Sequence, residues 1–125
     1  MFNLFNSLMG SSPAVNAAHA VQAVAEKRAL VIDVREEAEV RASGKAKGAL
    51  HLPLSRLHLT ADPNSGHFDK RLAEAKKAGL PLYLYCASGA RSGRAAGILR
   101  SYGFAEVHNL GTLGAWAQGG GAVQR

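Results

Sequence analysis

Short apolar runs alternate with segments of helical periodicity along this chain of 125 residues. The run at 29–34 is continuous and rich in β-branched residues, which is typical of a strand buried on both faces. Three further runs, at 49–52, 82–85 and 107–110, predict three more strands. Helical spacing predicts helices at 12–27, 36–43 and 70–78, after residue 92 and around Leu113 and Trp116. Because strands alternate with helices, we expect an α/β fold with a mostly parallel sheet.

Capping residues mark the expected ends of the helices. Ser12 followed by Pro13 favours a helix start, because serine caps a first turn and proline fits within it. Gly44, Gly79 and Gly103 favour helix ends, since glycine readily adopts the conformation that closes a helix.

Length and charge bound the class of protein. A chain of this length forms one domain, which we place at 12–118, with an N-terminal tail at 1–11 and a flexible C-terminal tail at 119–125. The net charge of +6 comes without a basic stripe interleaved with aromatics, which favours solubility and small anions over nucleic acid.

No apolar stretch reaches the ~20 residues of a membrane span. Residues 1–10 lack the basic start of a signal peptide, so we expect a cytoplasmic protein rather than periplasmic export.

A single cysteine, Cys86, ends the third apolar run. One cysteine excludes an intramolecular disulfide, a CxxC redox pair and a cysteine-rich zinc cluster. The five histidines have no ligand-like spacing, and neither a metal nor a cofactor is predicted. Small or cationic residues follow the cysteine before the helical pattern begins: Ala87, Ser88, Gly89, Ala90, Arg91 and Ser92.

This order predicts a strand, a tight loop and a helix N-terminus. Such an end offers unpaired backbone N–H groups and a partial positive charge, and a loop of small residues lets those groups surround an anion. A cysteine in that place ionises easily, and the thiolate is its reactive form. We therefore expect Cys86 to be a nucleophile in an anion cradle. Gly89 would supply a backbone conformation that larger residues resist, and Arg91 a cation at the mouth.

Polar residues also follow two other predicted strands. Asp33 and Arg35 end one, and Asn109 lies near the end of another. Sites in open α/β sheets gather at the carboxyl ends of the strands, so these groups could converge near the cysteine. We expect Asp33 and Arg35 to order loops through hydrogen bonds and an ion pair. Among the remaining candidates, Trp116 is expected in the core, His51 and His108 are expected to be structural or exposed, and Ser88 and Ser92 could simply cap the helix.

Four segments in order resemble the rhodanese (thiosulfate sulfurtransferase) family in its single-domain form. They are the Asp-Val-Arg strand end at 31–36, the segment 43–54, the cysteine loop at 85–92 and the stretch from Gly103 to Trp116. The resemblance covers residues 12–118. It implies a five-stranded parallel sheet between helices on both faces.

The resemblance also implies a ping-pong sulfur transfer through a Cys86 persulfide. The donor would be a small sulfur anion such as thiosulfate, and the acceptor cyanide, a thiol, thioredoxin or another sulfur-acceptor protein. Two positions depart from the family pattern: Lys45 stands where histidine is usual, and Ala87 where many relatives carry a basic residue. Because the second departure removes a cation and leaves Arg91, with Arg94 beyond it, we do not expect thiosulfate to be the preferred donor.

Two other functions remain as alternatives. Cysteine-dependent phosphatases and arsenate reductases place an arginine after five intervening residues, whereas four residues separate Cys86 from Arg91. The shorter loop favours a single sulfur atom over a tetrahedral phosphate. A non-catalytic, protein-binding rhodanese-like module often lacks the cysteine, which this chain retains.

Overall fold

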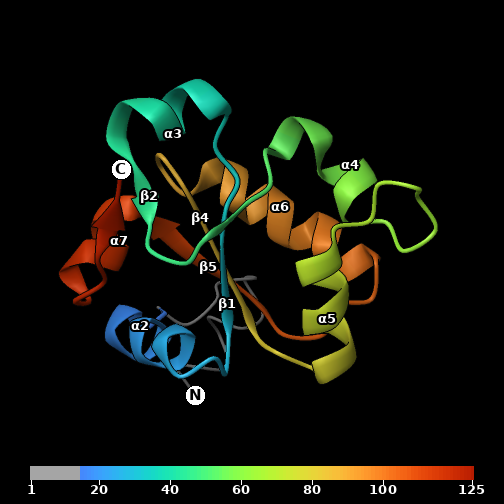
Figure 1. Ribbon diagram of the computed structural model, residues 1–125, viewed down its shortest axis with the longest axis horizontal. Coiled ribbons are helices and arrows are strands. Elements are labelled where there is room, and N and C mark those ends of the chain that lie inside the picture. Colours follow the sequence, from blue (N-terminus) through green and yellow to red (C-terminus); the bar gives the residue numbers. More distant parts are fainter. Residues whose placement is uncertain (1–14) are drawn as a thin grey trace, which may run out of the picture.

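A computed structural model describes residues 15–125, and a parallel sheet runs through the middle of the molecule (Figure 1). The strand order is β3 (Leu50–His51), β1 (Leu30–Asp33), β4 (Leu82–Cys86) and β5 (Val107–Thr112). Every neighbouring pair in this sheet is parallel. The strands predicted from the four apolar runs are thereby confirmed.

Helices cover both faces of the sheet (Figure 1). On one face lie α2 (Ala17–Ala25) and α7 (Leu113–Gln118), and on the other η1 (Leu54–Arg56), α4 (Leu57–Thr60), α5 (Lys70–Ala78) and α6 (Ala90–Ser101). The remaining helix, α3 (Glu37–Ser43), follows the carboxyl end of β1, and a separate antiparallel ribbon joins β2 (Lys45–Ala46) to β6 (Val123–Gln124). The predicted α/β class is confirmed.

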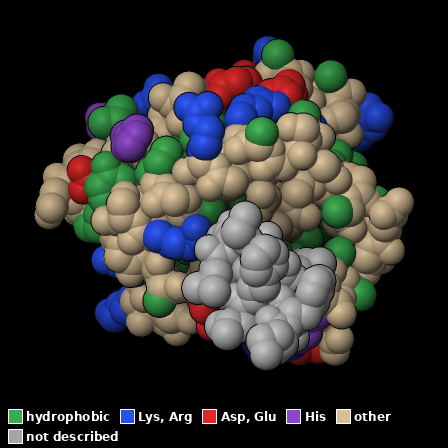
Figure 2. All heavy atoms as spheres, turned by 180° about the vertical axis from the view of Figure 1, so that it is seen from behind, with side chains coloured by type: hydrophobic (Ala, Val, Ile, Leu, Met, Phe, Trp, Pro, Cys, Tyr) green, Lys and Arg blue, Asp and Glu red, His purple; other side chains and the backbone are tan. Residues whose placement is uncertain are grey.

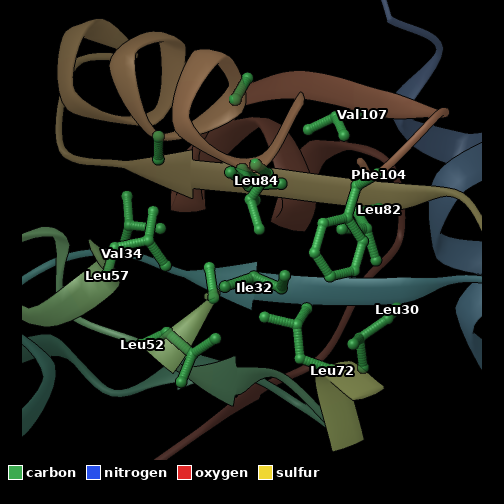
Figure 3. Close-up of a cluster of buried hydrophobic side chains, with 14 of the residues drawn as sticks. Leu30, Ile32, Val34, Leu52, Leu57, Leu72, Leu82, Leu84, Phe104 and Val107 are labelled. Atoms are coloured by element: carbon green, nitrogen blue, oxygen red, sulfur yellow. The ribbon is translucent and has the colours of Figure 1, made fainter. Parts of the chain in front are cut away.

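Successive side chains of each strand point to opposite faces of the sheet, so the hydrophobic core has two parts. Leu30, Ile32, Leu82 and Leu84 pack toward α5 and α6, and Figure 3 shows such side chains filling the layer between strands and helices. The intervening strand residues face α2 and α7, whose cluster contains Ala20, Ala23, Val31, Tyr83, Tyr85, Leu110 and Trp116. With only 2% of its surface exposed, Trp116 occupies the core as expected. A strand covered on both faces must be apolar throughout, which explains the continuous run in β1.

Within residues 15–125, the first helix is α2. The expected start, Ser12-Pro13, lies outside the described residues. Asn16 has an extended backbone, and its side chain accepts a hydrogen bond of 3.0 Å from the backbone N–H of His19. Asparagine is as good a cap as serine, so α2 begins at Ala17.

Two further expectations differ from the structure. The resemblance implied five strands, whereas the sheet within residues 15–125 has four. The segment expected as a flexible tail at 119–125 is anchored, because β6 pairs with β2 and the Trp116 indole donates a hydrogen bond of 2.8 Å to the carbonyl of Ala122. The pairing of β6 with β2 joins segments distant in sequence, so local composition gave no sign of it.

A buried polar network fixes the carboxyl end of β1. The Arg35 guanidinium lies 2.7 Å from Asp33 Oδ2, and the Tyr85 hydroxyl donates a hydrogen bond of 2.6 Å to the same oxygen. Burial and this hydrogen bond raise the pKa of Tyr85 well above its usual range, so the hydroxyl stays protonated and donates. Since buried charges are costly unless paired, each partner depends on the others.

The same network holds the start of the ribbon and the end of α3. Arg35 also donates hydrogen bonds of 2.6 Å to Ser43 Oγ and to the carbonyl of Gly44. The Tyr85 hydroxyl oxygen in turn accepts a hydrogen bond of 2.9 Å from the backbone N–H of Ala46. The expected loop-ordering role of the β1 residues thus extends to the chain between α3 and β2.

We expect Tyr85→Phe to lower the free energy of unfolding by about 1–3 kcal/mol, because it leaves the buried Ala46 N–H unpaired and removes one donor from Asp33. Urea denaturation measures the change. Tyr83→Phe is the matched control, since it removes a hydroxyl from the same face of β4 that makes neither bond. An equal loss in both variants would contradict a specific role for the Tyr85 hydroxyl.

Candidate active site

Cys86 lies where β4 ends and the chain turns into α6. Its side chain is buried, and two backbone N–H groups face its sulfur. The N–H of Gly89 lies 3.0 Å from Sγ and the N–H of Ser92 3.4 Å. The first turn of a helix has no internal acceptors for such donors, so the sulfur takes the place of an acceptor. This is the strand, loop and helix start that the sequence predicted.

Gly89 allows the loop to turn back onto the sulfur. Its backbone has φ +94° and ψ −12°, a left-handed conformation that residues with a Cβ rarely adopt. A Cβ at this position would come no closer than 3.6 Å to Gly111 Cα, an ordinary contact. The requirement for glycine therefore comes from the backbone and not from lack of space.

The thiol of Cys86 is more acidic than an ordinary cysteine. Burial alone raises its pKa, but hydrogen bonds outweigh burial and lower the pKa of Cys86 to about 7. The donors are the Ser92 hydroxyl and the backbone N–H groups of Ser92, Ser88 and Gly89. Each of them favours the charged form, so the thiolate is well populated near neutral pH.

The other loop residues have different surroundings. Ala87, Ser88 and Ala90 are exposed, whereas Ser92 is fully buried in the first turn of α6. Gly89 occupies the N-cap position of α6 and has no side chain with which to cap the helix. Ser88 Oγ accepts a hydrogen bond of 3.4 Å from the backbone N–H of Ala90, so this serine does contribute to capping the first turn. Ser92 instead lies against the sulfur.

Arg91 is paired with Glu39 of α3. Its two terminal nitrogens each lie 2.7 Å from one carboxylate oxygen, and both side chains are about one-third exposed. Hydrogen bonding to Arg91 lowers the pKa of Glu39 to about 2, and the carboxylate raises the pKa of Arg91. The charge of Arg91, which the sequence analysis expected at the mouth of the cradle, is thus neutralised by a carboxylate.

Asn109 is the strand-end residue that reaches the cysteine loop. Its Oδ1 accepts a hydrogen bond of 2.7 Å from the Ser92 hydroxyl, and its Nδ2 donates one of 2.9 Å to the carbonyl of Gly89. The convergence suggested by the sequence is therefore confirmed for Asn109. The Asp33–Arg35 pair instead supports the site indirectly, since Arg35 binds Ser43 at the end of the helix that carries Glu39.

Sequence reasoning did not single out Glu39 as a partner of Arg91. The two residues lie 52 positions apart, and their pairing depends on how α3 packs beside α6. The sequence indicates only a local role for this residue, because a glutamate at this position can cap the start of a helix. Glu39 indeed forms a capping box with Glu36 at the start of α3. A capping role explained the residue without requiring a distant contact.

The expected structural roles of two histidines are also visible. His51 Nε2 lies 2.7 Å from the backbone oxygen of Arg35, and the His108 ring stacks on Tyr83 with centroids 5.1 Å apart. Within residues 15–125, no group of three His, Cys, Asp or Glu side chains could hold a metal ion.

Charge is dispersed over the visible surface. Figure 2 shows Lys and Arg side chains scattered over the described part of the back face, with acidic side chains beside them at its upper edge. Among the helices of residues 15–125, none has the length and apolar character to cross a membrane.

Comparisons with known proteins agree with this geometry. The sequence profile of the rhodanese-like domain family matches residues 16–118, which include the whole parallel sheet and the cysteine loop. A curated relative, the uncharacterized protein YqhL of Bacillus subtilis, is 36% identical over 98 residues, or 78% of this chain. The chain spans 66% of the length of that relative.

Two solved structures have the same fold but are described with different functions. The human single-domain sulfurtransferase TSTD1 superposes with a TM-score of 0.66 at 29% identity, covering 86% of this chain and 97% of that one. A protein of unknown function from Rhodopseudomonas palustris, described as a possible tyrosine phosphatase, gives a TM-score of 0.72 at 26% identity, covering 86% and 81%. The fold is therefore shared by proteins to which different chemistry has been ascribed.

The rate of alkylation by iodoacetamide should rise with pH through a midpoint of about 7, because only the thiolate reacts and hydrogen bonds lower the pKa of Cys86. Mass spectrometry follows the labelling, and Cys86→Ser, which removes the single cysteine, supplies the blank. A midpoint near the ~8.5 of a free cysteine would show that the N–H groups do not stabilise the anion.

Proposed function

The chain belongs to the rhodanese-like domain family, and from this membership we propose that it is a sulfurtransferase that carries a sulfane sulfur on Cys86 as a persulfide. The observation that carries the proposal is the pair of N–H groups, from Gly89 and Ser92, that face Sγ. Oriented N–H donors stabilise a localised negative charge without needing a formal cation. Both the thiolate and the persulfide anion are charges of this kind.

The transfer consists of two displacements at sulfur. The Cys86 thiolate attacks the outer sulfur of thiosulfate, an S–S bond forms, and the original S–S bond breaks with its electron pair leaving on sulfite. The product is a Cys86 persulfide anion. A nucleophile such as cyanide or a thiolate then attacks the outer sulfur, takes it as thiocyanate or a new persulfide, and returns Cys86 as thiolate. No external oxidant or reductant is consumed.

The same loop argues against the two alternatives. Four residues separate Cys86 from Arg91, and the Arg91 guanidinium is bound to Glu39. A phosphatase instead needs an arginine free to bind the equatorial oxygens of the phosphoryl group. A binding module has no use for a cysteine whose pKa is lowered to about 7. The sulfur chemistry accounts for both features.

The Glu39–Arg91 pair also bears on the choice of donor. A dianion such as thiosulfate gains little from a cation whose charge is already neutralised. We therefore propose that the preferred donors are less charged, such as a persulfide on a small thiol or on a protein. Reduced thiols, including thioredoxin, would act as acceptors in the cytoplasm.

Incubation with thiosulfate should add one sulfur atom, ~32 Da, to the intact protein. Intact-protein mass spectrometry detects the gain, which cyanide should reverse and which Cys86→Ser should lack. The same preparations are offered an aryl phosphate. Phosphate release that depends on Cys86, with no sulfur gain from thiosulfate or a small-thiol persulfide, would contradict the proposal and favour the phosphatase.

Glu39→Gln should increase kcat/KM for thiosulfate about threefold or more, because it releases the Arg91 charge toward the incoming dianion, and the gain should shrink in high salt. An uncharged organic trisulfide, used as a second donor, should show no comparable gain. Glu37→Gln is the matched control: it makes the same charge change on α3 but belongs to an exposed pair with Arg41. A lower rate with thiosulfate in Glu39→Gln, or an equal gain in both variants, would contradict this role of Glu39.

A further inference from the structure

The buried hydroxyl of Ser92 faces two acceptors but carries one hydrogen. Cys86 Sγ lies 3.4 Å from Ser92 Oγ, and Asn109 Oδ1 lies 2.7 Å from it. A hydroxyl donates one hydrogen bond at a time. The two contacts therefore compete, and the shorter one to the amide oxygen has the better geometry.

The orientation of the Asn109 amide follows from its second contact. The carbonyl of Gly89 can only accept a hydrogen bond, so the amide group that lies 2.9 Å from it must be the Nδ2 donor. The other end of the amide, Oδ1, then faces Ser92 and can only accept. While Cys86 is a thiol, the hydroxyl hydrogen of Ser92 accordingly points to Asn109 and away from sulfur.

We infer that Asn109 is a positioning residue that holds the Ser92 hydroxyl hydrogen while Cys86 is a thiol and yields it to the sulfur when the thiolate forms. The step is a rotation about the Cβ–Oγ bond of Ser92, with no covalent bond made or broken. The backbone N–H groups of Gly89 and Ser92 remain on the sulfur in both states. Because Asn109 is exposed, water can replace the hydrogen bond that its oxygen loses.

The consequence is that Asn109 limits the acidity of Cys86. The hydroxyl of Ser92 stabilises the thiolate. Because it must give up its hydrogen bond to Asn109 to do so, the pKa of Cys86 falls only by the difference in free energy between the two hydrogen bonds. Removing the amide oxygen should leave the hydroxyl free for the sulfur. This role of Asn109 adds a positioning residue to the proposed sulfurtransferase site. Its effect on sulfur transfer rests on the proposed function.

Charged neighbours do not account for the expected effect. The titratable side chains on the elements around Cys86 are Arg91, Arg94 and Arg100 on α6, Glu37, Glu39 and Arg41 on α3, Asp33 on β1, Tyr83 and Tyr85 on β4, His58 on α4 and His108 on β5. Arg91 is the one whose pKa the Cys86 thiolate raises. Replacing Asn109 or Ser92 with a neutral residue leaves all of these charges in place.

The test is a double-mutant cycle of Asn109→Leu and Ser92→Ala, with leucine chosen because it is close in size to asparagine and forms no hydrogen bonds. The pKa of Cys86 is read from the ultraviolet absorbance of the thiolate, with Cys86→Ser in each background as the blank. This readout needs neither a sulfur donor nor access of a reagent to the buried thiol. We expect Asn109→Leu to lower the pKa of Cys86 by about 0.5 to 1, and Ser92→Ala to raise it.

The decisive comparison is the effect of Asn109→Leu in the Ser92→Ala background, where we expect no shift, because the shared hydrogen is gone. If Asn109 served only to hold the loop through Gly89, its loss would raise the pKa of Cys86 in both backgrounds. An upward shift, or an equal shift in both, would overturn the inference. Asn109→Ala provides the same comparison should the leucine variant not fold. Sulfur loading is measured in a separate experiment. A protein that gains no sulfur but shows the expected pKa shifts would contradict the proposed function and not the role of Asn109.

Discussion

The site depends on the N–H groups of Gly89 and Ser92 being directed at the sulfur of the last residue of β4. The sulfur is held in place because β4 lies between β1 and β5. The N–H donors are directed at it because Gly89 adopts a left-handed conformation that reverses the chain. Together with the Ser92 hydroxyl, these N–H groups outweigh the burial that raises the pKa of Cys86. A reactive thiol in this protein is a property of backbone geometry more than of neighbouring charge.

Two ion pairs near the site have different physical roles. The Asp33–Arg35 pair is buried and linked to Tyr85, so it fixes the path of the chain after β1, and breaking it would leave an uncompensated charge in the core. The Glu39–Arg91 pair is partly exposed, contributes little to stability, and controls how much positive charge a donor meets. The cradle therefore depends on oriented dipoles, which suits the compact charge of a persulfide better than that of a large anion.

Much of this could be predicted from the sequence, and the remainder has a common cause. The continuous run before Asp33 and the run that ends at Cys86 predicted buried strands, and the small residues after the cysteine predicted a tight loop. These are local signals. The partner of Arg91, the anchoring of the chain after Trp116 by pairing with β2, and the contact between Ser92 and Asn109 all join segments distant in sequence. Side-chain periodicity carries no information about which distant groups meet, so Arg91 was predicted as a cation at the mouth of the cradle without its partner Glu39.

The most direct test of the cradle is a pH titration of the backbone amide signals of Gly89 and Ser92 by nuclear magnetic resonance. If their N–H groups stabilise the anion, both signals will shift with a common midpoint of about 7, and the transition will be absent in Cys86→Ser. Amide signals that stay unchanged while Cys86 ionises would contradict this role, and the acidity of the thiol would then need another source.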